Sequence, residues 1–174
     1  TDNLKAGYRM GEYMKPYLNE DSVIGIMEHI KGVSTAVERE QGLLEALGTY
    51  GDQIVDVRYC DSSNDKSYEE TKAMLTENPD INVIFCLNED SASGAARAVH
   101  DMGLGGKVAM VGFDSSLEEI QFLESGVFNA IVVQRPLNMG YLGLSMAYQA
   151  ARSQEVPRTV ESGSVLTTKA TIYT

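Results

Sequence analysis

The sequence predicts an α/β fold, with an open, doubly wound, mostly parallel sheet between two layers of helices. Three observations lead to this prediction. Short β-rich runs recur about every 25–30 residues, the intervals between them carry helical patterns with start signals, and the runs are continuously apolar rather than alternating. Strands that are apolar on both faces need cover on both faces, and crossover helices provide this cover in a parallel sheet.

Five strands are predicted from these runs. A helix at about residues 4–18 precedes the first strand. The fourth run, "VAMVGF", is apolar throughout and is followed at once by Asp114. The predicted strands are residues 23–27, 54–59, 83–87, 108–113 and 130–133.

Helix starts are predicted where Ser or Thr is followed three residues later by Glu. In such a capping box the hydroxyl accepts from a backbone N–H of the first turn, and the Glu side chain accepts from the N–H of the cap residue. The three pairs are Thr35 with Glu38, Ser67 with Glu70, and Ser116 with Glu119. A further helix is predicted over residues 91–102.

The pattern changes after Pro136. A helix predicted over residues 138–152 is apolar nearly all round, which is typical of a helix that is covered on more than one side. A polar stretch follows at residues 153–163, and residues 165–173 are a candidate terminal strand.

Composition excludes several classes of protein. The 174 residues carry a net charge of -11, spread along the chain, which opposes binding to nucleic acid. The sequence has no apolar run near the roughly 18 residues that span a membrane. Cys60 and Cys86 both lie in or beside apolar runs, so we expect buried, unreactive thiols.

Polar side chains follow three of the predicted strands. Asn88, Asp114 and Gln134 stand at strand ends, and the carboxyl ends of parallel strands share one edge of the sheet, where ligands bind. Arg39, early in the helix after the first strand, is expected over the same edge. Each residue could instead cap a helix or hold a loop. Together, however, a carboxylate, two amides and a guanidinium suit the vicinal hydroxyls of a sugar or polyol.

Other candidate sites are less specific. Ser62 and Ser63 lie in a polar loop, "DSSND", predicted at the same edge, and either could contact a ligand. That loop lacks the later glycine and glutamate of a calcium loop, so no metal site is predicted. His29 and His100 have no nucleophile motif beside them, and no catalytic residue or cofactor is predicted.

Five segments occur together in an order that covers nearly the whole chain. They are "TDNLKAG" (1–7), "REQG" (39–42), "NPDINVIFCLNEDSASGA" (78–95), "GKVAMVGFD" (106–114) and "VVQRPLNMGYLG" (132–143). In this set the chain resembles the type I periplasmic sugar-binding proteins of ABC transporters, the ribose-binding-protein group. Their fold is shared by the effector domains of lactose-repressor-type regulators.

The resemblance implies a role for each candidate residue. Arg39, Asn88, Asp114 and Gln134 match the family's ligand-binding arginine, asparagine, aspartate and glutamine. It also implies reversible binding of a sugar or polyol without catalysis, ABC permease subunits as partners, and a periplasmic or extracellular location, in some members as a lipoprotein.

Family members have two similar lobes, and this chain resembles only the second. Residues 1–135 would be the C-terminal ligand-binding lobe, 136–155 a crossover helix belonging to the first lobe, and 156–174 the return segment and terminal strand. We therefore expect a piece of a longer protein. We also expect the helix at 138–152 to pack on a partner chain, for example in a homodimer, or back onto its own domain.

Two alternatives stay open at this point. An effector domain of a transcription regulator would have the same pocket. A Rossmann-type nucleotide enzyme is disfavoured, because the glycine-rich "GLGGKV" precedes a strand instead of following one and opening a helix.

Overall fold

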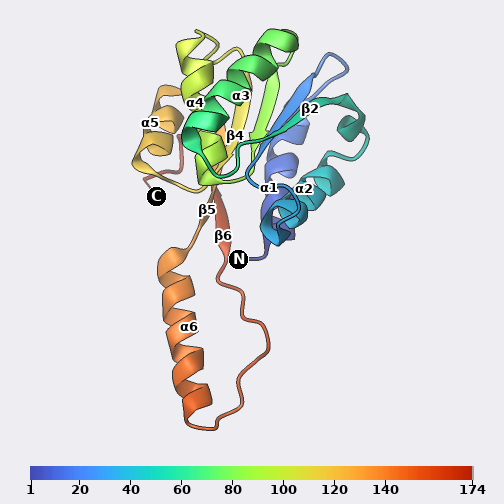
Figure 1. Ribbon diagram of the computed structural model, residues 1–174. Coiled ribbons are helices and arrows are strands. Elements are labelled where there is room, and N and C mark those ends of the chain that lie inside the picture. The colour runs from blue at the N-terminus through green and yellow to red at the C-terminus, as the bar shows by residue number, and fades with distance from the viewer. Residues whose placement is uncertain (174) are drawn as a thin grey trace.

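The computed structural model describes residues 1–173 and confirms the predicted three-layer α/β fold (Figure 1). The sheet formed by these residues has six strands in the order β2-β1-β3-β4-β5-β6. Neighbours among β1 to β5 are parallel, and β6 is antiparallel to β5. The strands are β1 (Ile24–Glu28), β2 (Ile54–Tyr59), β3 (Val83–Cys86), β4 (Ala109–Phe113), β5 (Ala130–Gln134) and β6 (Ser164–Thr167).

The helices form two layers. Helices α1 and α2 cover one face of the sheet, and α3, α4 and α5 cover the other (Figure 1). A further helix, α6, leaves the domain after β5. The helices are α1 (Asn3–Met14), α2 (Ser34–Leu47), α3 (Asn64–Glu77), α4 (Glu89–Asp101), α5 (Leu117–Ser125) and α6 (Pro136–Ala151), with 3-10 turns at Lys15–Tyr17 and Gly48–Gln53.

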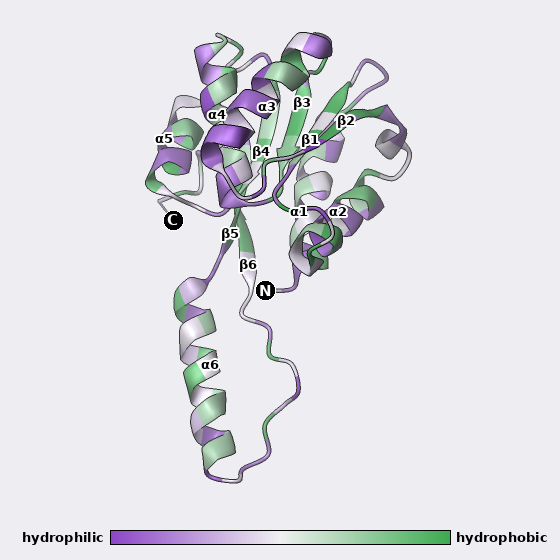
Figure 2. Ribbon diagram, in the orientation of Figure 1, coloured by the Kyte–Doolittle hydropathy of each residue, from purple (hydrophilic) through white to green (hydrophobic). Residues whose placement is uncertain are grey.

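Side chains of each central strand enter both cores, as the continuous apolar runs predict. In β1, Ile26 belongs to the core under α1 and α2, whereas Met27 belongs to the core under α3 to α5. Hydrophobic colour accordingly concentrates along the strands (Figure 2). Cys60 and Cys86 are both buried free thiols, as predicted, and burial raises the pKa of each.

The five predicted parallel strands are present, each within one residue of the predicted ends. The first helix ends at Met14 rather than residue 18, because Pro16 lacks an N–H and the chain tightens into a 3-10 turn. The predicted terminal strand is also too long. Strand β6 ends at Thr167, and a backbone bond from the Thr171 N–H to the Thr168 carbonyl then turns the chain.

One of the three predicted capping boxes is correct. Ser116 and Glu119 begin α5 with both reciprocal bonds. The prediction at Thr35 is wrong: α2 begins at Ser34 without a side-chain cap, and the Thr35 hydroxyl lies 2.9 Å from His29 Nε2.

The capping box predicted at Ser67 is wrong as well. Ser63 caps α3, and Ser67 lies inside that helix, where its hydroxyl donates to the Ser91 carbonyl. In both failed cases another hydrogen bond uses the hydroxyl that the sequence pattern assigned to a cap, a local one at Thr35 and a long-range one at Ser67.

Helices α1 and α2 cross so closely that glycine is required on each. A Cβ added at Gly7 would lie 1.9 Å from the backbone oxygen of Arg39, and one added at Gly42 would lie 1.9 Å from that of Leu4. The two contacts are reciprocal, because each glycine faces the backbone of the other helix. The crossing brings the start of α1 next to Arg39.

Helix α6 projects from the carboxyl edge of the sheet, and a long segment returns from it to β6 (Figure 1). None of its residues is buried, and Leu137 is 91% exposed. The expectation that this helix packs back onto its own domain is therefore wrong. Its 16 residues are too few to cross a bilayer, and within residues 1–173 no other helix is a candidate span.

Candidate ligand-binding site

Two predicted residues meet where β4 and β5 end. The Gln134 side-chain N–H donates to Asp114 Oδ1 over 2.8 Å. Asp114 has a positive φ of 79°, and its backbone N–H donates to the Val132 carbonyl over 2.8 Å. This left-handed turn, which Asp tolerates better than most residues, ends the strand and fixes the carboxylate at the sheet edge.

Arg39 reaches the same edge from α2. The residue is only 5% exposed, and its Nη1 donates to the Leu87 carbonyl over 2.7 Å, just after β3. Its guanidinium stacks on Phe113 of β4, with Cζ 3.7 Å from the ring centroid. Burial lowers the pKa of Arg39, and the nearby Asp114 carboxylate opposes that change. The guanidinium therefore remains a charged donor.

Arg39 also marks the switch point of the sheet. Strand β2 lies on one side of β1, and β3, the next strand along the chain, lies on the other side of β1. The direction in which strands are added therefore reverses between β1 and β3. Ligands of open parallel sheets bind outside the carboxyl ends of the strands at such a point.

Asn88 is a helix cap in the structure. Its side-chain oxygen accepts from the Ser91 N–H over 3.0 Å, which is half of a capping box at the start of α4. Its amide nitrogen lies 3.4 Å from Asp90 Oδ2. The cap uses only the side-chain oxygen, and the NH2 group of Asn88 has a second N–H that can donate at the sheet edge. A contact between Asn88 and a ligand stays a prediction.

A hollow of about 470 Å³ opens beside Asp114, and we call it the edge hollow. Burial raises the pKa of Asp114, while the bond from Gln134 and the charge of Arg39 lower it. The pKa of Glu89 is also raised, first by burial and then by the Asp114 charge. The edge hollow is lined by Glu89, Asp114, Ser115, Gln134, Pro136 and Met139.

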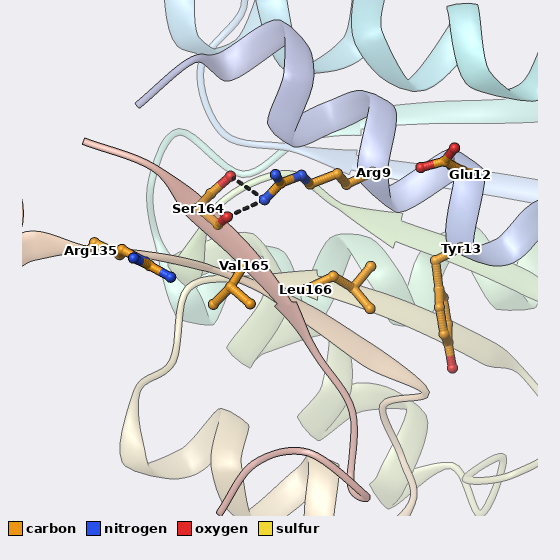
Figure 3. A pocket seen from close by; sticks show the side chains of 7 residues that line it. All are labelled: Arg9, Glu12, Tyr13, Arg135, Ser164, Val165 and Leu166. Atoms are coloured by element: carbon orange, nitrogen blue, oxygen red, sulfur yellow. Dashed lines mark hydrogen bonds between the residues drawn. The ribbon is translucent and has the colours of Figure 1, made fainter. Parts of the chain in front are cut away.

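A larger hollow, about 570 Å³, lies between α1 and β6 (Figure 3). Arg9 closes one end of it by donating to the backbone and side-chain oxygens of Ser164. None of the predicted site residues lines it. Of its two arginines, Arg9 is already bound to Ser164, and Arg135 and Glu12 lie at opposite ends of the hollow (Figure 3).

Ser62 and Ser63 follow β2 at the carboxyl edge of the sheet, but β2 is the edge strand and is separated from β4 and β5 by β1 and β3. Ser63 accepts from the Lys66 N–H as the cap of α3, and Ser62 is exposed. Among the described residues, no hydrogen bond joins either serine to the other four candidates. The structure does not bring them to the edge hollow, and their contact with a ligand stays a prediction.

The sequence patterns did not single out two residues that hold the site. The Thr1 hydroxyl donates to Gln134 Oε1 over 2.8 Å, which fixes the orientation of that amide toward Asp114. Asn3 Oδ1 accepts from Arg39 Nε over 3.0 Å. Both belong to the opening "TDN" and meet residues far along the chain, so no local spacing could have revealed them.

Residues 1–155 match a family model described as a periplasmic binding protein domain. The chain belongs to this family. The resemblance inferred from the motifs is thereby confirmed.

Individual relatives of the chain are sugar-binding or sugar-transport proteins by name. The ribose import binding protein of Haemophilus influenzae is 28% identical over 156 residues, which are 90% of this chain and 53% of the relative. A sugar transporter structure from Clostridium phytofermentans is 43% identical, with a TM-score of 0.89, and the match covers 97% of this chain and 60% of that one.

A periplasmic solute binding protein of an ABC transporter from Actinobacillus succinogenes, solved with bound D-allose, is 29% identical. Its TM-score is 0.90, over 98% of this chain and 61% of that one. The present chain spans about half the length of the curated relatives it matches.

Glu119, at the start of α5, is a buried acid next to the site. It is 0% exposed and accepts from the Ser116 N–H over 2.7 Å. Burial raises its pKa to about 8, because desolvation outweighs the bonds from Ser116, and the Glu89 and Asp114 charges add to the rise.

We predict that Glu119 makes stability fall as the pH rises. Between about pH 4.3 and 8 the unfolded chain has released a proton that the folded chain keeps, so the free energy of unfolding decreases across this window. Glu119→Gln keeps an acceptor for Ser116 and removes the titration. Urea unfolding at pH 5, 7 and 9 measures the free energy of unfolding. From pH 5 to pH 9, that of the native protein should fall by on the order of 1–4 kcal/mol more than that of the variant. Parallel pH profiles would contradict this.

Proposed function

We propose that this chain forms the ligand-binding lobe of a sugar-binding protein of an ABC transporter. The observation that carries the proposal is the meeting of Asp114, Gln134 and Arg39 at the carboxyl edge of the sheet, in a chain of the periplasmic binding protein family. The lobe would occupy residues 1–135, with 136–155 and 156–174 as the crossover helix and the return segment.

The chemistry of the site suits hydroxyl groups. Ionised Asp114 can accept from two vicinal hydroxyls, and one of its oxygens is already oriented by Gln134. Arg39 and the amide nitrogen of Asn88 can donate to the oxygens of the same hydroxyls. No nucleophile paired with a base lines the edge hollow. We therefore propose reversible binding without catalysis or a cofactor.

The names of the relatives support an aldose as ligand. One is a ribose import binding protein, and one solved structure holds D-allose. We propose a pentose or hexose for this chain, permease subunits as partners, and a periplasmic or extracellular location, with lipoprotein anchoring as one form of it. The comparisons support this proposal rather than the regulator or the nucleotide enzyme.

We predict weak sugar binding by this chain alone. A single lobe contacts one side of the ligand, whereas binding sites usually bury most of a small ligand's surface. Ligand-observed NMR titration with D-ribose and D-allose should give a Kd of about 1 mM or weaker. Asp114→Ala should weaken binding at least about tenfold by removing the hydroxyl acceptor.

Asp80→Ala is the matched control for this titration, because Asp80 is an exposed acid just before β3, at the opposite end of the strands. It should bind like the native chain. Micromolar affinity of the native chain would contradict the single-lobe account, and an unchanged affinity in Asp114→Ala would contradict the site.

Helix α6 is proposed to be covered by another apolar surface. In a two-lobe protein this surface would be the first lobe, and in this chain alone it would be a second copy. The exposed side chains that need cover include Leu137, Tyr141, Leu144 and Tyr148, which are 59–91% exposed.

Sedimentation velocity at rising concentration tests the second copy. The native chain should form a dimer, and Leu144→Glu should remain monomeric, because a carboxylate in an apolar interface is costly to desolvate. Gln121→Glu adds the same charge on the exposed surface of α5 and should not change the association. A native chain that is monomeric at every concentration would contradict the proposal.

A further inference from the structure

We propose that Asn3 is a positioning residue for Arg39, and that it holds the guanidinium in the one orientation that serves the ligand site. The inference rests on the proposed function, since Arg39 is a ligand donor only if the site binds sugar. It concerns a residue of α1 that touches neither Asp114 nor the edge hollow.

The Asn3 side chain is used at both ends. Its oxygen accepts from Arg39 Nε over 3.0 Å, and its nitrogen donates to Glu38 Oε2 over 3.1 Å. A flipped amide would place N–H groups against the guanidinium and oxygen against the carboxylate. The two neighbours therefore fix which way the amide points, and Asn3 is a rigid acceptor for Arg39.

Three contacts then determine the plane of the guanidinium. Asn3 holds Nε, the Leu87 carbonyl holds Nη1, and the Phe113 ring covers one face. Because a guanidinium is planar and has five N–H donors, two fixed donors and one stacked face also set the directions of the other three. Without Asn3, Arg39 could turn about its bond to Leu87.

Asn3 can contact Arg39 because two glycines allow α1 and α2 to cross closely. Gly7 lies against the Arg39 carbonyl, and Gly42 lies against the Leu4 carbonyl, one residue after Asn3. These contacts bring the first turn of α1 to Arg39. The motifs "TDNLKAG" and "REQG" thus have a shared physical role, which is to present one side chain correctly.

Hydrogen exchange of arginine side chains tests the positioning without any sugar. The Arg39 Nε–H should exchange with water at least about tenfold faster in Asn3→Ala than in the native chain. Arg58 is an internal control, because its Nε donates to Asp56 over 3.0 Å in another part of the domain. The Arg58 Nε–H should keep its native rate, whereas a general loss of stability would accelerate both.

A double variant provides the rescue. Asn3→Asp with Glu38→Gln reverses the polarity of that pair, so the new carboxylate accepts from both Arg39 and the glutamine amide. Slow exchange at Arg39 should return. The proposal is overturned if Asn3→Ala leaves the Arg39 rate unchanged, if Arg39 and Arg58 accelerate alike, or if the double variant exchanges as fast as Asn3→Ala.

Titration with D-allose connects the positioning to binding. Asn3→Ala should weaken binding about tenfold, and the double variant should recover it. Equal affinities in the native chain and Asn3→Ala, with Arg39 loosened, would overturn the positioning role. A native chain that binds neither D-allose nor D-ribose would instead overturn the proposed function, and the exchange result would stand.

Discussion

The buried guanidinium of Arg39 connects four parts of the molecule. It joins α1 through Asn3, the end of β3 through the Leu87 carbonyl, β4 through the Phe113 ring, and the ligand edge through the charge of Asp114. A buried cation is tolerated only when its donors have partners and a counter-charge is near. The close crossing of α1 and α2, the switch point of the sheet and the proposed site are therefore parts of one arrangement.

That arrangement gives the site its chemical character. Asp114 is held in a left-handed turn at the end of an apolar strand, with Gln134 on one oxygen and Arg39 near enough to offset part of its desolvation. Such a carboxylate is a prepared acceptor for hydroxyls, because its orientation is fixed before the ligand arrives. Helix α6 leaves the same edge with no side chain buried, and its Pro136 and Met139 line the edge hollow.

Local patterns predicted the sheet and its polar edge, but not the contacts that hold the edge together. Apolar runs placed five strands, and the residues after them gave Asn88, Asp114 and Gln134. Capping boxes failed at Thr35 and Ser67, because His29 and the Ser91 carbonyl are the partners of these hydroxyls. Thr1 and Gln134 are 133 positions apart, and Asn3 and Arg39 are 36 apart, so only the folded chain brings them together.

A protein-observed NMR titration of this chain with D-allose, with the backbone assigned, locates the binding site directly. The shift changes should concentrate on Asn88, Asp114, Gln134 and their neighbours at the carboxyl edge of the sheet. Changes concentrated on the hollow between α1 and β6, around Arg9, Tyr13 and Leu166, would contradict this location.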